Sequence, residues 1–232
     1  MADAINTVFA GYDKLILSVL HFLSRFLGFL LTPLAKLVTF LGEKGIVFFL
    51  LALVLMCFAK TRKTGVCIFG AVCCGALITN VILKDWIARP RPFEGLELFR
   101  QWWEAVGSPA EDGFSFPSGH VTAAAAGMTA LYRAEGKKYL KPGIIVVLVM
   151  MVSRNYLMAH YPSDVLFGAL VGIGSGYLAW EITKWIFRFL EEHPDQQLCR
   201  FALEFDLPLP QIALPGVKLP GAKPKKKGKH QL

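Results

Sequence analysis

The sequence predicts an all-α fold, a polytopic transmembrane helix bundle with about six membrane-spanning helices. Of the 232 residues, 54% are hydrophobic, and the mean hydropathy of +0.48 lies well above that of a soluble domain. Apolar runs close to the roughly 20 residues that a bilayer requires alternate along the chain with short basic segments. Together these observations predict an integral membrane protein.

The first apolar run, residues 15–41, is interrupted by His21, Arg25, Pro33 and Lys36. Such a run fits either a kinked span or an interfacial helix that is followed by re-entry into the membrane. We expect a span. Residues 1–44 are assigned to an N-terminal helical segment that precedes the membrane core.

Residues 45–190 form the predicted membrane core. Its spans are expected at residues 45–59, 65–83, 121–132, 144–159 and 164–190. Residues 93–116 carry acidic side chains and two tryptophans, which predicts an extramembrane loop with an interfacial aromatic belt. In the last span a glycine recurs every four residues, at Gly168, Gly172 and Gly176. This spacing predicts a closely packed helix face.

The distribution of charge predicts the orientation of the chain. The basic segments outside the motifs described below are residues 60–63, 133–141 and 223–229. Alternating spans place all three on one side of the membrane, which the positive-inside rule assigns to the cytoplasm. Residues 191–232 are then a basic, proline-rich cytoplasmic tail, in which we expect no regular structure after His193. The expected location is the cell membrane, with a site on its outer face.

Composition also narrows the classes of ligand. The formal net charge is +8, but the basic residues lie between apolar runs and in the tail, so we expect the membrane as partner and not nucleic acid. The five cysteines lie mostly inside apolar segments and are predicted to be free thiols. No cysteine and histidine spacing matches a zinc site, and no acidic cluster suits calcium or magnesium. We therefore expect no metal and no cofactor.

Arg154, His160 and Asp164 lie at the junction of the last two predicted spans. Pro162 suits the first turn of a helix, which places Asp164 in that turn and within reach of the His160 imidazole. A histidine held in this way, with Arg154 nearby to bind an anion, can attack phosphorus and carry a phosphoryl group. A histidine followed four residues later by an aspartate is also a common structural hydrogen bond. This stretch alone leaves both interpretations open.

Two further stretches contain similar residue types. One contains Phe116, Pro117, Ser118, Gly119 and His120, and the other runs from Lys84 to Pro92 and includes Arg89 and Arg91. A charged side chain in hydrocarbon costs about 2.5–3.5 kcal/mol on insertion scales, so these cations must share a hydrated pocket or pair with an anion. A helix that begins at Ser118 would add free backbone N–H groups. The combination is typical of a phosphate site.

With these residues the chain resembles the type 2 phosphatidic acid phosphatase family (PAP2), membrane lipid phosphatases related to vanadium haloperoxidases. The motifs of that family are Lys-x6-Arg-Pro, Pro-Ser-Gly-His and Ser-Arg-x5-His-x3-Asp. They match here at Lys84, Arg91 and Pro92, at Pro117, Ser118, Gly119 and His120, and at Ser153, Arg154, His160 and Asp164. The resemblance covers about residues 45–185 and leaves the N-terminal helix and the tail outside it.

The resemblance implies a metal-independent phosphatase without a cofactor. His160 would attack phosphorus, Asp164 would orient it, and His120 would protonate the leaving oxygen and later activate water. The oxygens of the phosphoryl group would be held by Lys84, Arg91, the Ser118 hydroxyl, the Gly119 N–H and Arg154. Arg89-Pro90 duplicates Arg91-Pro92 two residues earlier, and only the spacing from Lys84 favours Arg91.

The function that these patterns favour is hydrolysis of a lipid phosphomonoester or diphosphate through a phosphohistidine intermediate. Undecaprenyl diphosphate, phosphatidylglycerophosphate and phosphatidic acid are all candidate substrates, and the sequence does not choose among them or give an oligomeric state. The alternatives are a membrane transporter and a non-catalytic protein that binds lipid phosphates. The chain has no detectable internal repeat, and its charges cluster at one face of the membrane, which disfavours a transporter.

Overall fold

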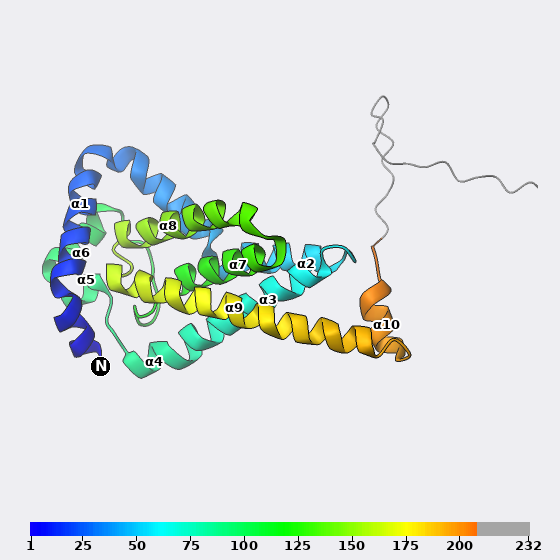
Figure 1. Ribbon diagram of the computed structural model, residues 1–232. Helices are drawn as coiled ribbons and strands as arrows, with labels where there is room; N and C mark the ends of the chain where they lie inside the picture. The colour runs from blue at the N-terminus through cyan, green and yellow to red at the C-terminus, as the bar shows by residue number, and fades with distance from the viewer. Residues whose placement is uncertain (208–232) are drawn as a thin grey trace, which may run out of the picture.

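The computed structural model describes residues 1–207, and within that range every element of regular secondary structure is a helix (Figure 1). The all-α prediction is confirmed for the described part of the chain. Three stretches are long and apolar enough to cross a membrane, namely Ala2–Met56, Arg62–Gly95 and Pro162–Glu192. Two further helices, α7 (Gly119–Glu135) and α8 (Leu140–Tyr156), have 17 residues each. The count of about six spans stays a prediction.

The bundle is formed by α2 (Ile46–Met56), α3 (Arg62–Ala76), α7, α8 and α9 (Pro162–Glu192), which run along a common direction in Figure 1. Helix α9 lies against α7 at very short range. A Cβ added to Gly172 would lie 2.4 Å from the carbonyl oxygen of Thr122, and one added to Gly168 would lie 2.7 Å from that of Ser118. The predicted close-packing face of the last span is confirmed, and it fixes the start of α9 beside the start of α7.

The segment after α3 carries the first motif. Helix α3 continues through the π-helical segment η2 (Leu77–Leu83) into α4 (Lys84–Ile87), so the helix extends one turn beyond the predicted end of the span. It ends at Ala88, which adopts the left-handed conformation with φ 51°. The two prolines that follow, Pro90 and Pro92, disfavour continuation of the α-helix, which explains why it ends here.

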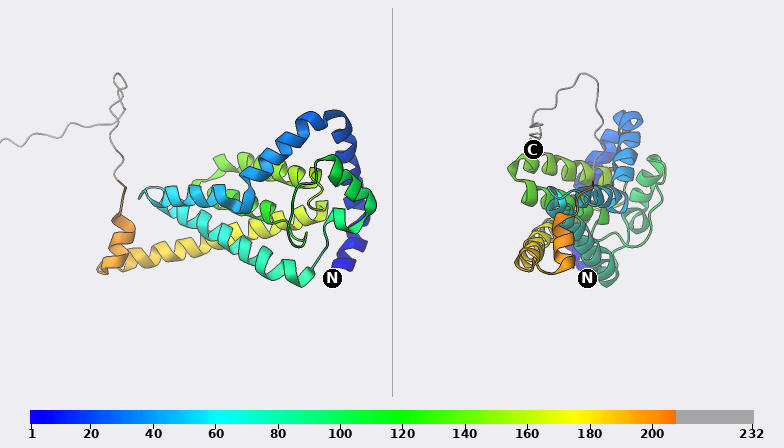
Figure 2. Two further views of the ribbon diagram at one scale, coloured as in Figure 1. Left: turned by 180° about the vertical axis from the view of Figure 1, so that it is seen from behind. Right: turned by 90° about the vertical axis from the view of Figure 1, so that its right-hand side faces the viewer.

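Helix α1 (Ala2–Leu41) is a single helix with Pro33 inside it. Its first part lies across the end of the bundle, and after a bend its second part leads toward α2, as both side views show (Figures 1 and 2). Pro33 lacks the N–H that would bond the carbonyl of Phe29, which permits a bend in this part of the helix. The bend agrees both with the kinked span that we expected and with an interfacial helix that re-enters the membrane, so a span over residues 15–41 stays a prediction.

The predicted extramembrane loop contains two short helices, α5 (Pro92–Gly95) and α6 (Glu97–Ala105). Helix α6 packs against α1, where the Trp102 ring stacks on the His21 ring with centroids 4.5 Å apart. Phe99 is buried in a cluster with Leu17 of α1. The tryptophan at position 102 therefore packs between two helices, and its place at the membrane interface stays a prediction.

The remaining elements lie at the turns and at the far end of the bundle. They are η1 (Glu43–Gly45), η3 (Lys137–Tyr139) and α10 (Gln197–Glu204). Helix α10 corrects the expectation of no regular structure after His193. Arg62 holds it, because its guanidinium donates hydrogen bonds to the carbonyls of Ala202 and Leu203 at 2.9 and 3.1 Å. Most of the predicted basic tail, residues 208–232, lies outside the described residues.

The contact between α7 and α9 predicts a large effect of one methyl group. Gly172→Ala should destabilise the protein by about 1–3 kcal/mol, because the new Cβ meets backbone atoms that cannot move aside. Gly174→Ala is the matched control, since nothing lies within 4 Å of its added Cβ. Thermal unfolding in detergent should show a lower midpoint for Gly172→Ala than for Gly174→Ala. Equal midpoints would contradict this packing.

Candidate active site

A pocket of about 780 Å³ brings residues of all three motifs together. Its lining includes Lys84 and Arg91 of the first motif, Gly119 and His120 of the second, and His160 of the third. These residues come from α4, the segment before α5, the start of α7 and the turn before α9. The convergence that the sequence led us to expect is therefore present in the fold.

His160 lies in the turn between α8 and α9 and is 1% exposed. Its Nδ1 is 2.7 Å from the carbonyl oxygen of Ser115. A carbonyl can only accept, so Nδ1 carries the proton and Nε2 is left with a lone pair. Burial, followed by the positive charges of Arg154, Arg91 and Lys84, holds the pKa of the His160 imidazole well below its usual range. The ring is thus uncharged near neutral pH, with a free lone pair on Nε2.

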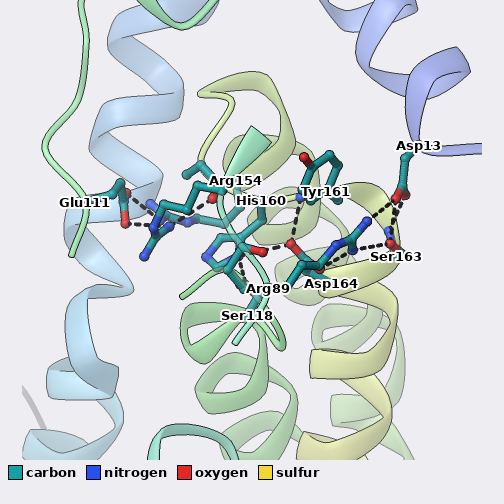
Figure 3. Close-up of polar contacts among 12 residues, drawn as sticks. Asp13, Arg89, Glu111, Ser118, Arg154, His160, Tyr161, Ser163 and Asp164 are labelled. Atoms are coloured by element: carbon teal, nitrogen blue, oxygen red, sulfur yellow. Dashed lines mark hydrogen bonds and ion pairs between the residues drawn. The ribbon is translucent and has the colours of Figure 1, made fainter. Parts of the chain in front are cut away.

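Asp164 is the third member of the last motif and lies in the first turn of α9, after Pro162, as predicted. Its Oδ2 is 3.7 Å from Nδ1 of His160, which is an ion-pair distance and too long for a hydrogen bond. The same oxygen accepts the backbone N–H of Tyr161 at 2.9 Å. Asp164 thus lies within reach of the His160 ring, as expected (Figure 3). The hydrogen bond of Nδ1, however, goes to the Ser115 carbonyl, and Asp164 contributes its charge from beside the ring.

The two arginines that were candidates for the first motif, Arg89 and Arg91, have different surroundings. Arg89 is turned away from the pocket lining and donates to Asp164 Oδ1 at 2.5 Å and to Asp13 Oδ2 at 2.8 Å. Arg91 lines the pocket, and its Nη1 donates to the carbonyl of Ala159 at 2.8 Å. The choice of Arg91 as the residue that faces the site agrees with this arrangement.

Arg91 and Arg154 share one carboxylate, that of Glu111. Its Oε2 is 3.3 Å from Nη1 of Arg91, and its Oε1 is 2.5 Å from Nη2 of Arg154 (Figure 3). Arg154 is fully buried, so its charge requires a partner. The Glu111 carboxylate thus lies between two guanidinium groups, and guanidinium groups bind phosphate as well as carboxylate.

The start of α7 supplies the second motif. Ser118 is the N-cap residue, and its buried Oγ has no hydrogen-bond partner among the described residues. The first N–H groups of α7, beginning with that of Gly119, have no partner within the helix. Free N–H groups, a dipole end and an unpaired hydroxyl together suit an anion. His120 lines the same pocket, and its Nε2 is 3.3 Å from a carboxylate oxygen of Glu43.

Sequence reasoning missed three partners of the motif residues. Ser115 supplies a carbonyl, Glu111 a carboxylate in a loop, and Asp13 a carboxylate from α1. Of these three, only the two acidic residues could have been sought from the sequence, because the buried cations of the motifs require negative charges to balance them. Among the described residues, no group of three His, Cys, Asp or Glu side chains is placed to hold a metal ion.

The model of the PAP2 superfamily matches residues 65–188. The chain belongs to the PAP2 superfamily. The resemblance stated from the motifs is confirmed, and the match begins at residue 65, so α1 and α2 precede it.

Similar proteins of this superfamily are phosphatases. The chain is 27% identical over 154 residues to an undecaprenyl-diphosphatase of Sulfolobus acidocaldarius, covering 66% of this chain and 72% of that protein. It is 32% identical over 126 residues to phosphatidylglycerophosphatase B of Bacillus subtilis, covering 50% and 56%. A crystal structure of a transmembrane PAP2 type phosphatidylglycerolphosphate phosphatase from Bacillus subtilis superposes with a TM-score of 0.59 at 25% identity, covering 81% of this chain and 92% of that one. This PAP2 protein is therefore an integral membrane phosphatase.

The shared carboxylate predicts competition between Glu111 and phosphate. In Glu111→Gln, inorganic phosphate should inhibit with a Ki lowered about tenfold, because an incoming anion no longer displaces a charge-assisted hydrogen bond. Glu104→Gln on the exposed face of α6 is the control and should leave the Ki unchanged. Competitive inhibition of phosphate release measures both values. A Ki that is unchanged or raised in Glu111→Gln would show that Glu111 does not occupy the anion position.

Proposed function

We propose that this PAP2 protein hydrolyses a phosphomonoester or diphosphate of a lipid through a phosphohistidine formed on His160. The observation that carries the proposal is the neutral His160 imidazole, whose Nε2 keeps its lone pair in a pocket lined by Lys84 and Arg91. A buried, uncharged nucleophile among cations is suited to attack on an anionic phosphoryl group. The substrate candidates remain undecaprenyl diphosphate, phosphatidylglycerophosphate and phosphatidic acid, and the names of the similar proteins favour the first two.

Substrate binding begins with exchange of anions. The phosphoryl group displaces the Glu111 carboxylate and takes its place between Arg91 and Arg154. The remaining oxygens are bound by Lys84, the Ser118 hydroxyl and the Gly119 N–H. Lys84 forms no ion pair within residues 1–207, and the Ser118 Oγ has no partner there, so both are available to a ligand. Such donors stabilise the charge that spreads over the equatorial oxygens in the transition state.

The reaction then proceeds in two displacements. Nε2 of His160 forms a bond to phosphorus while the bond from phosphorus to the leaving oxygen breaks, and His120 gives that oxygen a proton. His120 next takes a proton from water, the water oxygen attacks phosphorus, and the bond to Nε2 breaks to release phosphate. Burial, followed by the positive charge of Arg154, lowers the pKa of His120 in the site without substrate. Its protonated form therefore requires the negative charge of the bound phosphoryl group, to which the Glu43 carboxylate 3.3 Å away adds. The ring charge of phosphorylated His160 is stabilised by the Ser115 carbonyl and by Asp164.

The orientation in the membrane is also a proposal. The turn between α2 and α3 and the turn between α7 and α8 carry two of the basic segments, and both lie at the end of the bundle opposite α5 and α6 (Figure 1). The positive-inside rule assigns those turns to the cytoplasm. The pocket then opens on the outer face of the cell membrane. The division into residues 1–44, 45–190 and 191–232 is retained as the proposed domain organisation, with the third segment in the cytoplasm.

Phosphate release by the purified protein from the three candidate lipids tests the proposal. One lipid should be hydrolysed in the presence of EDTA, and His160→Ala should abolish turnover because no other neutral nucleophile is proposed in the pocket. His193→Ala, at the end of α9 and outside the pocket, is the matched control and should keep full activity. Substantial turnover by His160→Ala would exclude the proposed nucleophile. Binding of a lipid phosphate without any turnover by the wild type would favour the non-catalytic alternative.

A further inference from the structure

A buried ionic cluster lies beside His160, and two of its members belong to none of the three motifs. Arg89 donates from Nη1 to Asp164 at 2.5 Å and from Nη2 to Asp13 at 2.8 Å (Figure 3). The side chains of Arg89, Asp13 and Asp164 are 1%, 4% and 0% exposed. Asp13 belongs to α1, which precedes the part of the chain that the superfamily model matches. The cluster therefore joins an additional helix to a residue that the family motif assigns to the site.

Four of the five N–H groups of Arg89 donate hydrogen bonds within this cluster. Its Nε donates to the side-chain oxygen of Asn6 at 2.8 Å, and its Nη1 also donates to the Ser163 hydroxyl at 2.7 Å. The guanidinium carbon lies 3.9 Å from the centre of the Tyr161 ring, so the ring covers one face. Arg89 is thus held by four hydrogen bonds and an aromatic ring, and it is not among the residues that line the pocket.

Asp13 acts at a second point, the first turn of α9. Its Oδ1 accepts the Ser163 N–H at 2.8 Å, and its Oδ2 accepts the Ser163 hydroxyl at 2.7 Å. These bonds satisfy an N–H that has no partner inside α9 and place a negative charge at the positive end of the helix dipole. Asp13 therefore holds the same helix turn that carries Asp164.

The charges of the cluster do not cancel. One guanidinium lies between two carboxylates, so one negative charge is left over, 3.7 Å from Nδ1 of His160. A positive charge on the His160 ring, which attack on phosphorus produces, would be balanced by this excess. Hydrophobic contacts already attach α1 to the bundle, for example the edge-to-face pair of Phe9 and Phe167 at 5.9 Å. A buried ion cluster adds little stability compared with apolar packing, so attachment alone does not account for it.

We propose that Arg89 and Asp13 are positioning residues of the phosphatase reaction, which act through Asp164 on the orientation and charge balance of the His160 ring. Helix α1 is then part of the catalytic unit and not only a membrane anchor. The proposal rests on the proposed role of His160 as the nucleophile. It assigns no contact with substrate to either residue.

The test measures kcat, KM and the Ki of inorganic phosphate for Asp13→Asn, Arg89→Gln and Arg89→Lys in the full-length protein. Asp13→Asn and Arg89→Gln should lower kcat about tenfold or more, the range found when a partner behind a site residue is removed. KM and the phosphate Ki should stay within about twofold, because the cations that line the pocket are unchanged. Arg89→Lys should lower kcat less than Arg89→Gln, since the ammonium restores the charge but cannot bridge both carboxylates.

Matched controls come from the same helix. Asp3→Asn and Arg25→Gln remove exposed charges from α1 and should leave kcat unchanged. Asp13→Asn preserves the size of the side chain, so it keeps the test decisive if Arg89→Gln fails to fold. A kcat within twofold of wild type in folded Asp13→Asn would overturn the proposal. A parallel loss of kcat and of phosphate affinity would also overturn it, because that pattern indicates general damage to the pocket.

Failure of this inference can be told apart from failure of the proposed function. If His160→Ala is inactive while Asp13→Asn and Arg89→Lys keep wild-type kcat, only the positioning role is lost. If His160→Ala is active, the nucleophile is another group and both proposals fall together.

Discussion

The structure depends on the cost of burying positive charge at one end of an apolar bundle. Arg89, Arg91 and Arg154 are 1%, 2% and 0% exposed, and a buried charge without a partner is strongly unfavourable. The chain neutralises these positive charges in two ways. Arg89 is paired with two buried carboxylates, those of Asp13 and Asp164, whereas Arg91 and Arg154 share the single carboxylate of Glu111. The first arrangement builds a support, and the second leaves a position that another anion can take. In this account, phosphate binds where Arg91 and Arg154 already require a negative charge.

Backbone packing determines where these charges meet. Glycines in α9 allow its backbone to approach α7, so the start of α9, which carries Asp164, lies next to the start of α7, which carries Ser118. The backbone N–H of Ser118 donates to the carbonyl of Asp164 at 3.1 Å, which connects the second and third motifs directly. Helices α1 and α6 cover this end of the bundle through stacked and edge-to-face aromatic rings. The site is thus assembled from rigid helix ends, which suits a reaction that needs fixed donors around a transferring group.

Much of this arrangement could be predicted from the sequence, since hydropathy, motif spacing and helix punctuation are local signals. The start of α9 at Pro162, the packing glycines and the end of the helix before Pro90 all follow from a few neighbouring residues. The partners of the site residues could not be predicted in this way. The hydrogen bond from His160 to the Ser115 carbonyl, and the pairing of Arg89 with Asp13, join residues 45 and 76 positions apart. Such pairs depend on which helix ends meet in space. Every residue has a backbone carbonyl, so the residue type does not indicate which carbonyl will accept a hydrogen bond. The sequence alone did not decide whether α1 bends, because a proline permits a bend but packing determines whether the bend forms.

The central claim is that a neutral His160 becomes covalently phosphorylated. The most direct measurement is a single turnover with a lipid substrate labelled with 32P at the phosphoryl group, stopped in alkaline denaturant that preserves phosphoramidate bonds. The account predicts acid-labile, alkali-stable label on the wild-type chain, more label on His120→Ala because loss of the base slows hydrolysis of the intermediate, and none on His160→Ala. Label on His160→Ala, or release of phosphate by the wild type without any labelled chain at times within the first turnover, would contradict it.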